Sequence, residues 1–338
     1  MATYKEIFGT NIEVLASDPA NPVAGQVWYN STSNVVKGAA ATTSGAWSTE
    51  ASMNTGKRSL AAAGKSPTAA MGFGGTITSI TSNTELFNGS AWTEVNNMNT
   101  TRQKAGGGGT QTSALTFGGQ NPPYLSATES WNGTSWTEVN DLNTARIGLS
   151  QSSADNTDVL GFGGYTGTAY TGATESWNGT SWTELADLNT IRNNIGGAGD
   201  TNTAALAFGG NNPALSPNPT AATESWNGTS WTSVNDLNVA RIGSFGNFGT
   251  YTSAICAGGE PRSVNTNEQW NGTSWTEQTD MNEARQTLAG SGATGTTGLS
   301  IGGDNPTNPA KEDLGGSVGS TESWIGAGAP LIQTFTDS

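Results

Sequence analysis

Short apolar runs that each end in a pair of glycines recur along most of the chain. Each run is followed by a segment of variable length and then by two short aromatic stretches that flank Asn-Gly-Thr-Ser or a close variant. The glycine pairs are Gly74-Gly75, Gly118-Gly119, Gly163-Gly164, Gly209-Gly210, Gly258-Gly259 and Gly302-Gly303. Asn-Gly between two β-rich stretches is a strong hairpin signal, because both residues tolerate a positive φ. The pattern therefore predicts repeated units of short strands.

An arginine precedes each apolar run. Successive arginines are about 45 residues apart, a period typical of repeat folds. The six arginines are Arg58, Arg102, Arg146, Arg192, Arg241 and Arg285. In each unit the first strand begins after the arginine, the second ends in the glycine pair, and the third and fourth flank the Asn-Gly turn. Trp131 and Trp136 flank one such turn, and we expect their rings to face each other. Four strands at this period predict the blade of a β-propeller.

The order of these features resembles the kelch repeat: an apolar strand ending in Gly-Gly, two spaced aromatic residues, and a turn into an arginine. The resemblance covers residues 45–325 and implies an all-β, six-bladed kelch-like β-propeller with four strands per blade. The first unit departs slightly, with Phe87 where the others have Trp. The last unit has residues 321–324 but no Asn-Gly hairpin, and residues 46–50 form a strand without a unit. We therefore expect strand 46–50 to close the sixth blade, which would remove both open sheet edges.

Residues 1–44 and 326–338 lie outside the repeat, and we interpret them as an attachment segment and a C-terminal tail. Residues 27–30 and 35–38 are predicted to form a short hairpin around residues 31–34. The stretch Gly-Gln-Val-Trp-Tyr-Asn-Ser at 25–31 is similar to short N-terminal motifs of marine bacteriophage tail and other virion proteins. That resemblance implies a docking role, for which Trp28 and Tyr29 are the candidate residues.

The net charge of −14, from 27 acidic and 13 basic residues, argues against nucleic-acid binding, which needs a basic surface. The same charge opposes binding to anionic membranes. The sequence contains no run of 18 apolar residues, so we expect no insertion into a membrane. No secretory signal is recognisable, so we expect synthesis in a host cytoplasm. The single cysteine, Cys256, cannot form an intrachain disulfide, and its apolar neighbours predict a buried position.

No feature of the sequence predicts an active site, a cofactor or a metal ion. The chain has no histidine, which excludes Ser-His-Asp and Cys-His catalysis and imidazole-based metal sites. One glutamate recurs at an equivalent place in every unit. An active site needs different residues in different roles, so six equivalent glutamates favour a structural role. These glutamates are Glu85, Glu129, Glu175, Glu224, Glu268 and Glu322. We therefore expect a protein that is not an enzyme.

The candidate partner or ligand face is the one that carries the longest loops. In a four-stranded blade the second-to-third and the fourth-to-first connections emerge on the same face, and the former vary most in length here. Insertions concentrated on one face often mark a binding face, although surface loops also drift without function. The candidate residues on it are Tyr124, Tyr165, Tyr170, Asn211, Asn212, Arg262 and Lys311.

These expectations lead to two hypotheses about function. The first is a structural, non-enzymatic module of a bacteriophage virion, in the tail or a fibre, which contacts other virion proteins within a larger oligomeric assembly. The second is a lectin-like propeller that takes part in host attachment by binding surface glycans through its exposed tyrosines and amides. The virion location follows from the resemblance of residues 25–31, and the lectin-like alternative from the long loops.

Overall fold

The computed structural model describes residues 12–19, 26–41, 45–216, 218–242, 246–260, 264–305, 317–326 and 330–335. In these ranges it is all-β, without helices, and its strands form seven four-stranded sheets. The chain divides into two compact units, residues 46–324 and residues 1–45 with 325–338. Six of the sheets belong to the first unit and the seventh belongs to the second, which we call the terminal unit.

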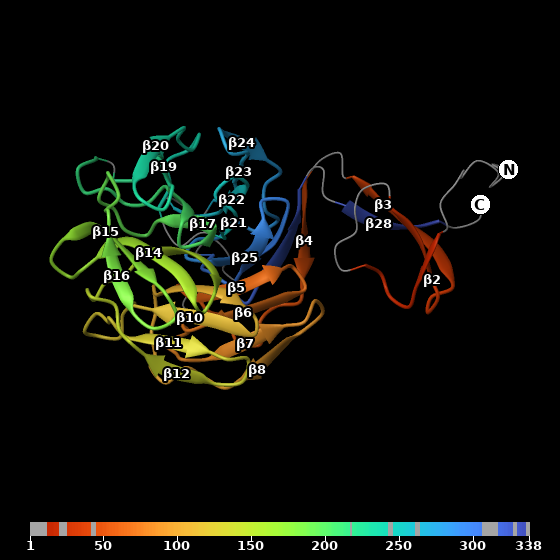
Figure 1. Cartoon of the computed structure of the whole chain (residues 1–338), viewed down its shortest axis with the longest axis horizontal. Helices are drawn as coiled ribbons and strands as arrows, with labels where there is room; N and C mark the ends of the chain where they lie inside the picture. Colours follow the sequence, from red (N-terminus) through yellow and green to blue (C-terminus); the bar gives the residue numbers. More distant parts are fainter. Residues whose placement is uncertain are drawn as a thin grey trace. The chain divides into compact units, whose positions relative to one another are not determined.

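The six sheets follow one another along the chain (Figure 1). The first contains β5 (Ala61–Ser66), β6 (Ala69–Phe73), β7 (Thr84–Phe87) and β8 (Trp92–Val95). The second contains β9 (Gly106–Thr110), β10 (Ser113–Phe117), β11 (Thr128–Trp131) and β12 (Trp136–Val139). The third contains β13 (Ser150–Asp155), β14 (Asp158–Tyr165), β15 (Tyr170–Trp177) and β16 (Trp182–Leu185).

The remaining three sheets repeat this order with one exception. The fourth contains β17 (Gly196–Thr201), β18 (Ala204–Phe208), β19 (Thr223–Trp226) and β20 (Trp231–Val234). The fifth contains β21 (Phe248–Gly249), β22 (Ala254–Ala257), β23 (Asn267–Trp270) and β24 (Trp275–Gln278). The sixth contains β25 (Ala289–Thr294), β26 (Thr297–Ile301), β27 (Thr321–Ile325) and β4 (Ala46–Glu50). Its fourth strand thus comes from the start of the repeat region, 46–50.

The Asn-Gly-Thr-Ser segments are tight hairpin turns, as their sequence predicts. In the second sheet the side-chain carbonyl of Asn132 accepts hydrogen bonds from the backbone N–H groups of Thr134 and Ser135, each at 2.9 Å. The turn sets Trp131 opposite Trp136 in the strand register, with ring centroids 5.5 Å apart. Aromatic pairs at this separation contribute about 0.5–1.5 kcal/mol beyond the area they bury. The prediction that these rings face each other is confirmed.

The glycine pairs lie where one sheet passes close to the chain that enters the next sheet. Gly118 and Gly119 have φ values of 65° and 96°. The N–H of Gly119 donates to the carbonyl of Arg146 at 2.9 Å, and a Cβ on Gly118 would lie 2.8 Å from the same oxygen. A side chain at either position would therefore be strained by its backbone conformation, and at Gly118 it would also collide with the next sheet.

Aromatic side chains pack each sheet against its neighbour. Phe117, at the end of β10, lies 4.8 Å from the ring of Trp182 in the next sheet. The indole N–H of Trp182 donates to the hydroxyl of Thr128 at 3.1 Å, back in the second sheet. The same bond recurs at Trp136–Thr84, Trp231–Thr174 and Trp275–Thr223. The core is therefore a series of clusters between adjacent sheets, and four buried threonines contribute hydroxyl groups to it: Thr84, Thr128, Thr174 and Thr223.

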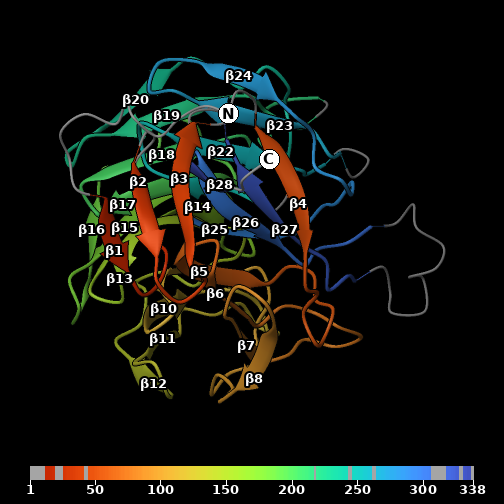
Figure 2. The same cartoon turned by 90° about the vertical axis from the view of Figure 1, so that its right-hand side faces the viewer.

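The first strands of the six sheets lie side by side around a common centre. Each contacts the first strand of the next sheet, and β25 of the sixth sheet contacts β5 of the first. In Figure 2 the fourth strands β8, β12, β16, β20, β24 and β4 follow one another at the periphery. Backbone hydrogen bonds join the chain segments that enter successive sheets, such as Lys104 N–H to Ser59 C=O at 2.9 Å. The bond from Ser59 N–H to Thr287 C=O, at 2.8 Å, joins the first sheet to the sixth.

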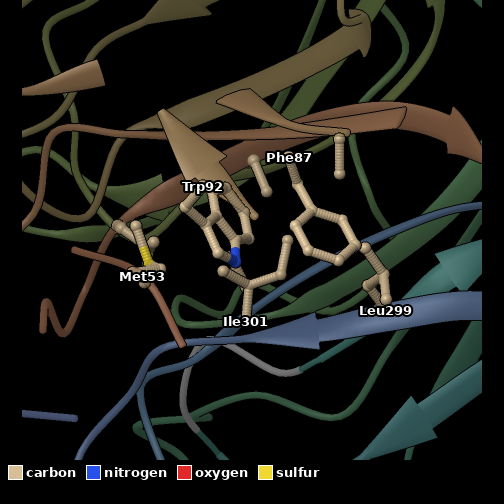
Figure 3. Close-up of a cluster of buried hydrophobic side chains, with 9 residues drawn as sticks. Met53, Phe87, Trp92, Leu299 and Ile301 are labelled. Carbon is tan, nitrogen blue, oxygen red and sulfur yellow. The ribbon is translucent and has the colours of Figure 1, made fainter. Parts of the chain in front are cut away.

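The first and sixth sheets also share a hydrophobic cluster (Figure 3). Phe87 and Trp92 of the first sheet pack with Leu299 and Ile301 of the sixth, and Met53 completes the group. On the other side of the sixth sheet, Trp47 and Trp324 pack with Phe248 of the fifth sheet, and the rings of Trp47 and Phe248 are 6.5 Å apart. The sixth sheet thus packs against both of its neighbours through residues that lie far apart in sequence.

The terminal unit is a sheet of order β1-β2-β3-β28. Its strands are β1 (Glu13–Leu15), β2 (Val27–Asn30), β3 (Val35–Ala41) and β28 (Pro330–Phe335). The β2–β3 hairpin is the one that the sequence predicts. Residues 326–338, interpreted from the sequence as a tail, include β28, which pairs antiparallel with β3. The sheet therefore contains strands from both ends of the chain, with the six-sheet unit inserted between β3 and β28.

Candidate functional site

One face of the six-sheet unit carries the connections from second to third strands and from fourth to first strands. The antiparallel order of each sheet places both sets at the same strand ends. We call this the loop face. Five of the predicted partner residues lie within the described part of the chain, in second-to-third connections or at the strand ends beside them: Tyr124, Tyr165, Tyr170, Asn211 and Asn212.

The three predicted tyrosines meet on the loop face. The rings of Tyr124 and Tyr165 are 6.0 Å apart at 73°, and those of Tyr165 and Tyr170 are 5.3 Å apart at 56°. The side-chain amide of Asn211 donates to the Tyr170 hydroxyl at 3.0 Å. All four residues are half-buried. We call this group the tyrosine cluster; it brings together residues from the second, third and fourth sheets.

The other predicted residues on this face do not join the cluster in the described structure. Asn212 is buried, and its side-chain oxygen accepts a hydrogen bond from the backbone N–H of Ala214 at 2.9 Å. The side chain of Asn212 therefore stabilises the loop that contains it and is not accessible to a binding partner. Arg262 and Lys311 lie outside the described residues.

Three exposed apolar residues on the loop face were not among the predicted residues. Ile191 and Val239 lie in fourth-to-first connections, and Leu215 lies in a second-to-third connection. The only other large exposed apolar residue of the described six-sheet unit is Tyr251, which lies on the opposite face between β21 and β22. A signal existed in the sequence for Ile191 and Val239. The positions equivalent to Ile191 carry Thr101 and Ala145, and those equivalent to Val239 carry Thr100 and Thr144.

The candidate docking residues of the terminal unit have different environments. Trp28 is fully buried, and its indole N–H donates to the Asp18 carboxylate at 3.1 Å. Lys37 forms an ion pair with the same carboxylate at 2.7 Å, and the hydrogen bonds from Lys37 and Asn30 lower the pKa of Asp18. Tyr29 is half-buried and donates to Asn34 at 3.1 Å. Tyr29 therefore has the more accessible ring, whereas Trp28 belongs to the core of the sheet.

Each sheet of the six-sheet unit contains one buried ion pair between a basic residue and the recurring glutamate. In the second sheet, Arg102 and Glu129 approach to 2.6 Å, and both are at most 1% exposed. The guanidinium also donates to the carbonyls of Gly118 and Ala127, at 3.1 and 2.6 Å. The glutamate accepts from the backbone N–H groups of Asn99 and Thr100, at 2.7 and 3.1 Å. The pair thus fixes the segment that enters each sheet, in agreement with the predicted structural role.

In the first sheet the basic residue is Lys57 rather than Arg58. Lys57 is fully buried and lies 3.2 Å from Glu85. Arg58 instead pairs through its backbone with Thr76, in the position that Gln103 holds opposite Gln120 in the second sheet. The interpretation of Arg58 as the first of six equivalent arginines is therefore wrong by one residue, because the equivalent position holds a lysine and is directly followed by an arginine.

Burial opposes the charged form of these basic groups. Desolvation lowers the pKa of Arg102, Arg146, Arg192 and Arg285, and of Lys57, while the partner glutamate opposes the shift in each case. The charges are tolerated because each pair is supported by several hydrogen bonds. Similar environments in every sheet favour a structural role and give no group a distinct acid or base function.

We expect Lys57→Arg to stabilise the protein, because an arginine could also reach the carbonyl of Gly74. Four of the five arginines bind the equivalent glycine carbonyl: Arg102, Arg192, Arg241 and Arg285. Among the residues that the structure describes, Lys57 donates to the carbonyl of Asn83, contacts Glu85 and donates to no other acceptor. One added hydrogen bond is worth about 1 kcal/mol and would raise the thermal midpoint by about 2–4 °C. Calorimetry checks this, with Arg102→Lys as the reciprocal variant that should lower the midpoint, since it loses the bond to Gly118. A lower midpoint for Lys57→Arg would contradict the equivalence of the two positions.

The first strands of all six sheets line a narrow central channel. Two cavities of about 50 Å³ each lie along it. One lining residue from each strand is Ala63, Gly108, Ser153, Gly199, Gly249 and Ser291. The ammonium of Lys65 reaches across to the carbonyl of Ser153 at 2.7 Å and the Asp200 carboxylate at 3.3 Å. Such cavities hold a few water molecules, whereas small-molecule sites occupy about 300 Å³ or more.

Comparison with solved structures identifies the architecture. The structure of YjhT, a kelch-type β-propeller protein, matches 83% of this chain and 99% of its own, with a TM-score of 0.62 and 14% sequence identity. The fold is a β-propeller. At this identity the likeness concerns the fold alone. A comparison with protein families found no match, and no curated protein matches the sequence.

Three further features concern the single cysteine, metal-binding side chains and membrane-spanning helices. Cys256 is buried, as predicted, and desolvation raises the pKa of its thiol to about 12. Among the described residues, no group of three or more Cys, Asp or Glu side chains is arranged to hold a metal ion. Within the same ranges, no helix has the length and apolar character needed to span a membrane.

Proposed function

We propose that this chain is a non-enzymatic structural and interaction module of a bacteriophage virion, in the tail or a fibre. The observation that carries the non-enzymatic part is the repeated ion pair, because the buried charged groups of every sheet serve the same structural contacts. The virion setting is supported by the similarity of residues 25–31 to N-terminal motifs of marine phage proteins. The module would bind other virion proteins within a larger assembly, bind no nucleic acid and insert into no membrane.

We further propose that residues 46–324 form a closed, six-bladed kelch-like propeller in which strand 46–50 completes the sixth blade. The sheet order β25-β26-β27-β4 supports this arrangement. So do the contact of β25 with β5 and the backbone bond from Ser59 to Thr287. A closed ring would suit a particle, since it offers a rigid body without open sheet edges.

The virion proposal predicts that the chain is a component of purified virus particles in fixed copy number. Quantitative mass spectrometry of particles from the source organism, with known capsid proteins as internal standards, measures this. The control is the lysate left after particles are removed, which should be depleted of the chain relative to soluble host proteins. Recovery of the chain only outside particles would overturn the virion proposal.

A second function is favoured by the tyrosine cluster. Three tyrosine rings and an amide side chain gathered on one face suit a lectin-like propeller that binds a surface glycan. The two functions are compatible, because a virion module can also bind the host surface.

A further inference from the structure

We propose that the tyrosine cluster, formed by Tyr124, Tyr165, Tyr170 and Asn211, is a binding site for a neutral carbohydrate. This inference rests on the second function above and assigns it a site and a ligand class. It does not depend on the virion setting. The argument uses the geometry of the rings, the hydrogen-bonding groups beside them, and the charge of the chain.

The rings form a continuous, ordered aromatic surface. Tyr165 lies between the other two, at 6.0 Å from Tyr124 and 5.3 Å from Tyr170. Its hydroxyl donates to the carbonyl of Gly167 at 2.9 Å. Gly167 has a φ of 97°, and a Cβ there would lie 2.6 Å from Cε2 of Tyr124. The absence of a side chain at Gly167 therefore allows Tyr124 to pack directly on the turn between β14 and β15.

Rings that are already fixed lose little conformational entropy when a ligand binds. The three tyrosines are half-buried, so each has a packed side and an accessible part. The apolar C–H face of a pyranose stacks on such a surface, because the face of an aromatic ring carries negative charge density and a C–H group is weakly positive. The cluster spans three neighbouring sheets, which gives it room for more than one sugar ring.

Polar groups suited to sugar hydroxyls lie beside the rings. Asn211 donates its side-chain N–H to the Tyr170 hydroxyl, so the Tyr170 proton remains available to an acceptor on a ligand. The Tyr124 hydroxyl makes no hydrogen bond to any residue within the described part of the chain, and so can donate or accept. A few placed polar groups on a largely apolar surface are typical of specific ligand sites.

Charge selects neutral ligands over acidic ones. The cluster contains no charged side chain, and the chain as a whole has a net charge of −14. A glycan with carboxylate or sulfate groups would be repelled by this field and would find no cationic partner in the cluster. A neutral hexose or N-acetylhexosamine unit avoids both costs.

The test is binding of defined sugars to the full-length protein. Lactose, maltose and chitobiose serve as neutral probes and sialyllactose as the acidic probe, with titration calorimetry and ligand-observed NMR as readouts. We expect at least one neutral probe to saturate the protein and to bind at least tenfold more tightly than sialyllactose. Tyr124→Ala should weaken that binding at least tenfold. Tyr251→Ala, which removes an exposed tyrosine from the opposite face, should leave it unchanged.

If Tyr124→Ala lowers the thermal midpoint, its loss of binding could come from unfolding. The ring NMR signals of the unmodified protein then show whether the sugar binds at the tyrosine cluster. Signals of the cluster tyrosines should shift on addition of the neutral sugar, while that of Tyr251 stays in place. The site is wrong if no neutral probe binds at millimolar concentration, if Tyr251 responds instead, or if sialyllactose binds more tightly. Particle mass spectrometry tests the virion proposal separately, so either proposal can fail alone.

Discussion

Deletion of residues 45–50 is expected to lower the thermal midpoint of the propeller by about 10 °C or more. The deleted strand carries Trp47, which packs against Trp324 at 5.2 Å and Phe248 at 6.5 Å. The Trp47 indole also donates to the carbonyl of Thr279 at 3.1 Å. Loss of a buried Trp costs about 3–5 kcal/mol, and the unpaired edge of β27 adds to this. Each kcal/mol corresponds to about 2–4 °C in a domain of this size.

Calorimetry of the full chain and the deletion variant measures this effect. Ser48→Ala, at an exposed position of the same strand, serves as the control and should change stability by less than about 0.5 kcal/mol. Trp47→Ala should account for a large share of the loss without shortening the chain. If the deletion variant melts with the full-length protein, strand 46–50 does not close the sixth blade.

Glu175→Ala should destabilise the protein by about 3–5 kcal/mol, since it leaves the Arg146 guanidinium buried without its partner. Arg146 is fully buried and lies 3.0 Å from Glu175. The same carboxylate accepts from the backbone N–H and the side-chain amide of Asn143, both at 2.8 Å. The substitution therefore also removes the acceptor for a backbone donor at the entry to the third sheet.

Chemical denaturation gives the free energy of unfolding for this comparison. The matched control is Glu184→Ala: Glu184 lies directly opposite Glu175 in the strand register but is exposed. It should cost less than about 0.5 kcal/mol. The double variant Arg146→Met, Glu175→Ala should recover only part of the loss, because Asn143 still lacks its acceptor. Equal stability of Glu175→Ala and the parent protein would mean that the ion pair does not fix the sheet entry.

The local structure of the repeat could be predicted from the sequence because each element depends on a short stretch of chain. Asn132 and its neighbours specify the hairpin turn, and Gly118-Gly119 specify the strand end by their conformational freedom. The pairing of Trp131 with Trp136 follows from the length of the turn. The strand 46–50 was recognised because the last unit lacks its own fourth strand.

Contacts between residues far apart in the chain could not be predicted from the sequence in the same way. The pairing of β28 with β3 joins residues about 290 positions apart, and an isolated run such as Pro330–Phe335 does not reveal its partner. Lys57 holds the same place three residues after Asn54 that Arg102 holds after Asn99, but the arginine beside it at position 58 concealed this equivalence. The tyrosines were selected by their loops, but their contacts depend on loop conformations, including the turn at Gly167. The sequence did not distinguish Asn211, which joins the cluster, from Asn212, which is buried.

Insertion of the propeller between β3 and β28 gives it two covalent tethers. The chain enters at β4 and leaves from β27, and the rings of Trp47 and Trp324 show that these strands lie together. A protease that cuts the chain between β3 and β4 would leave the propeller attached through the segment that leads to β28. A cut in that second segment would leave the first intact. Release of the propeller thus requires two cleavages, a form of resistance that a module joined by a single linker does not have.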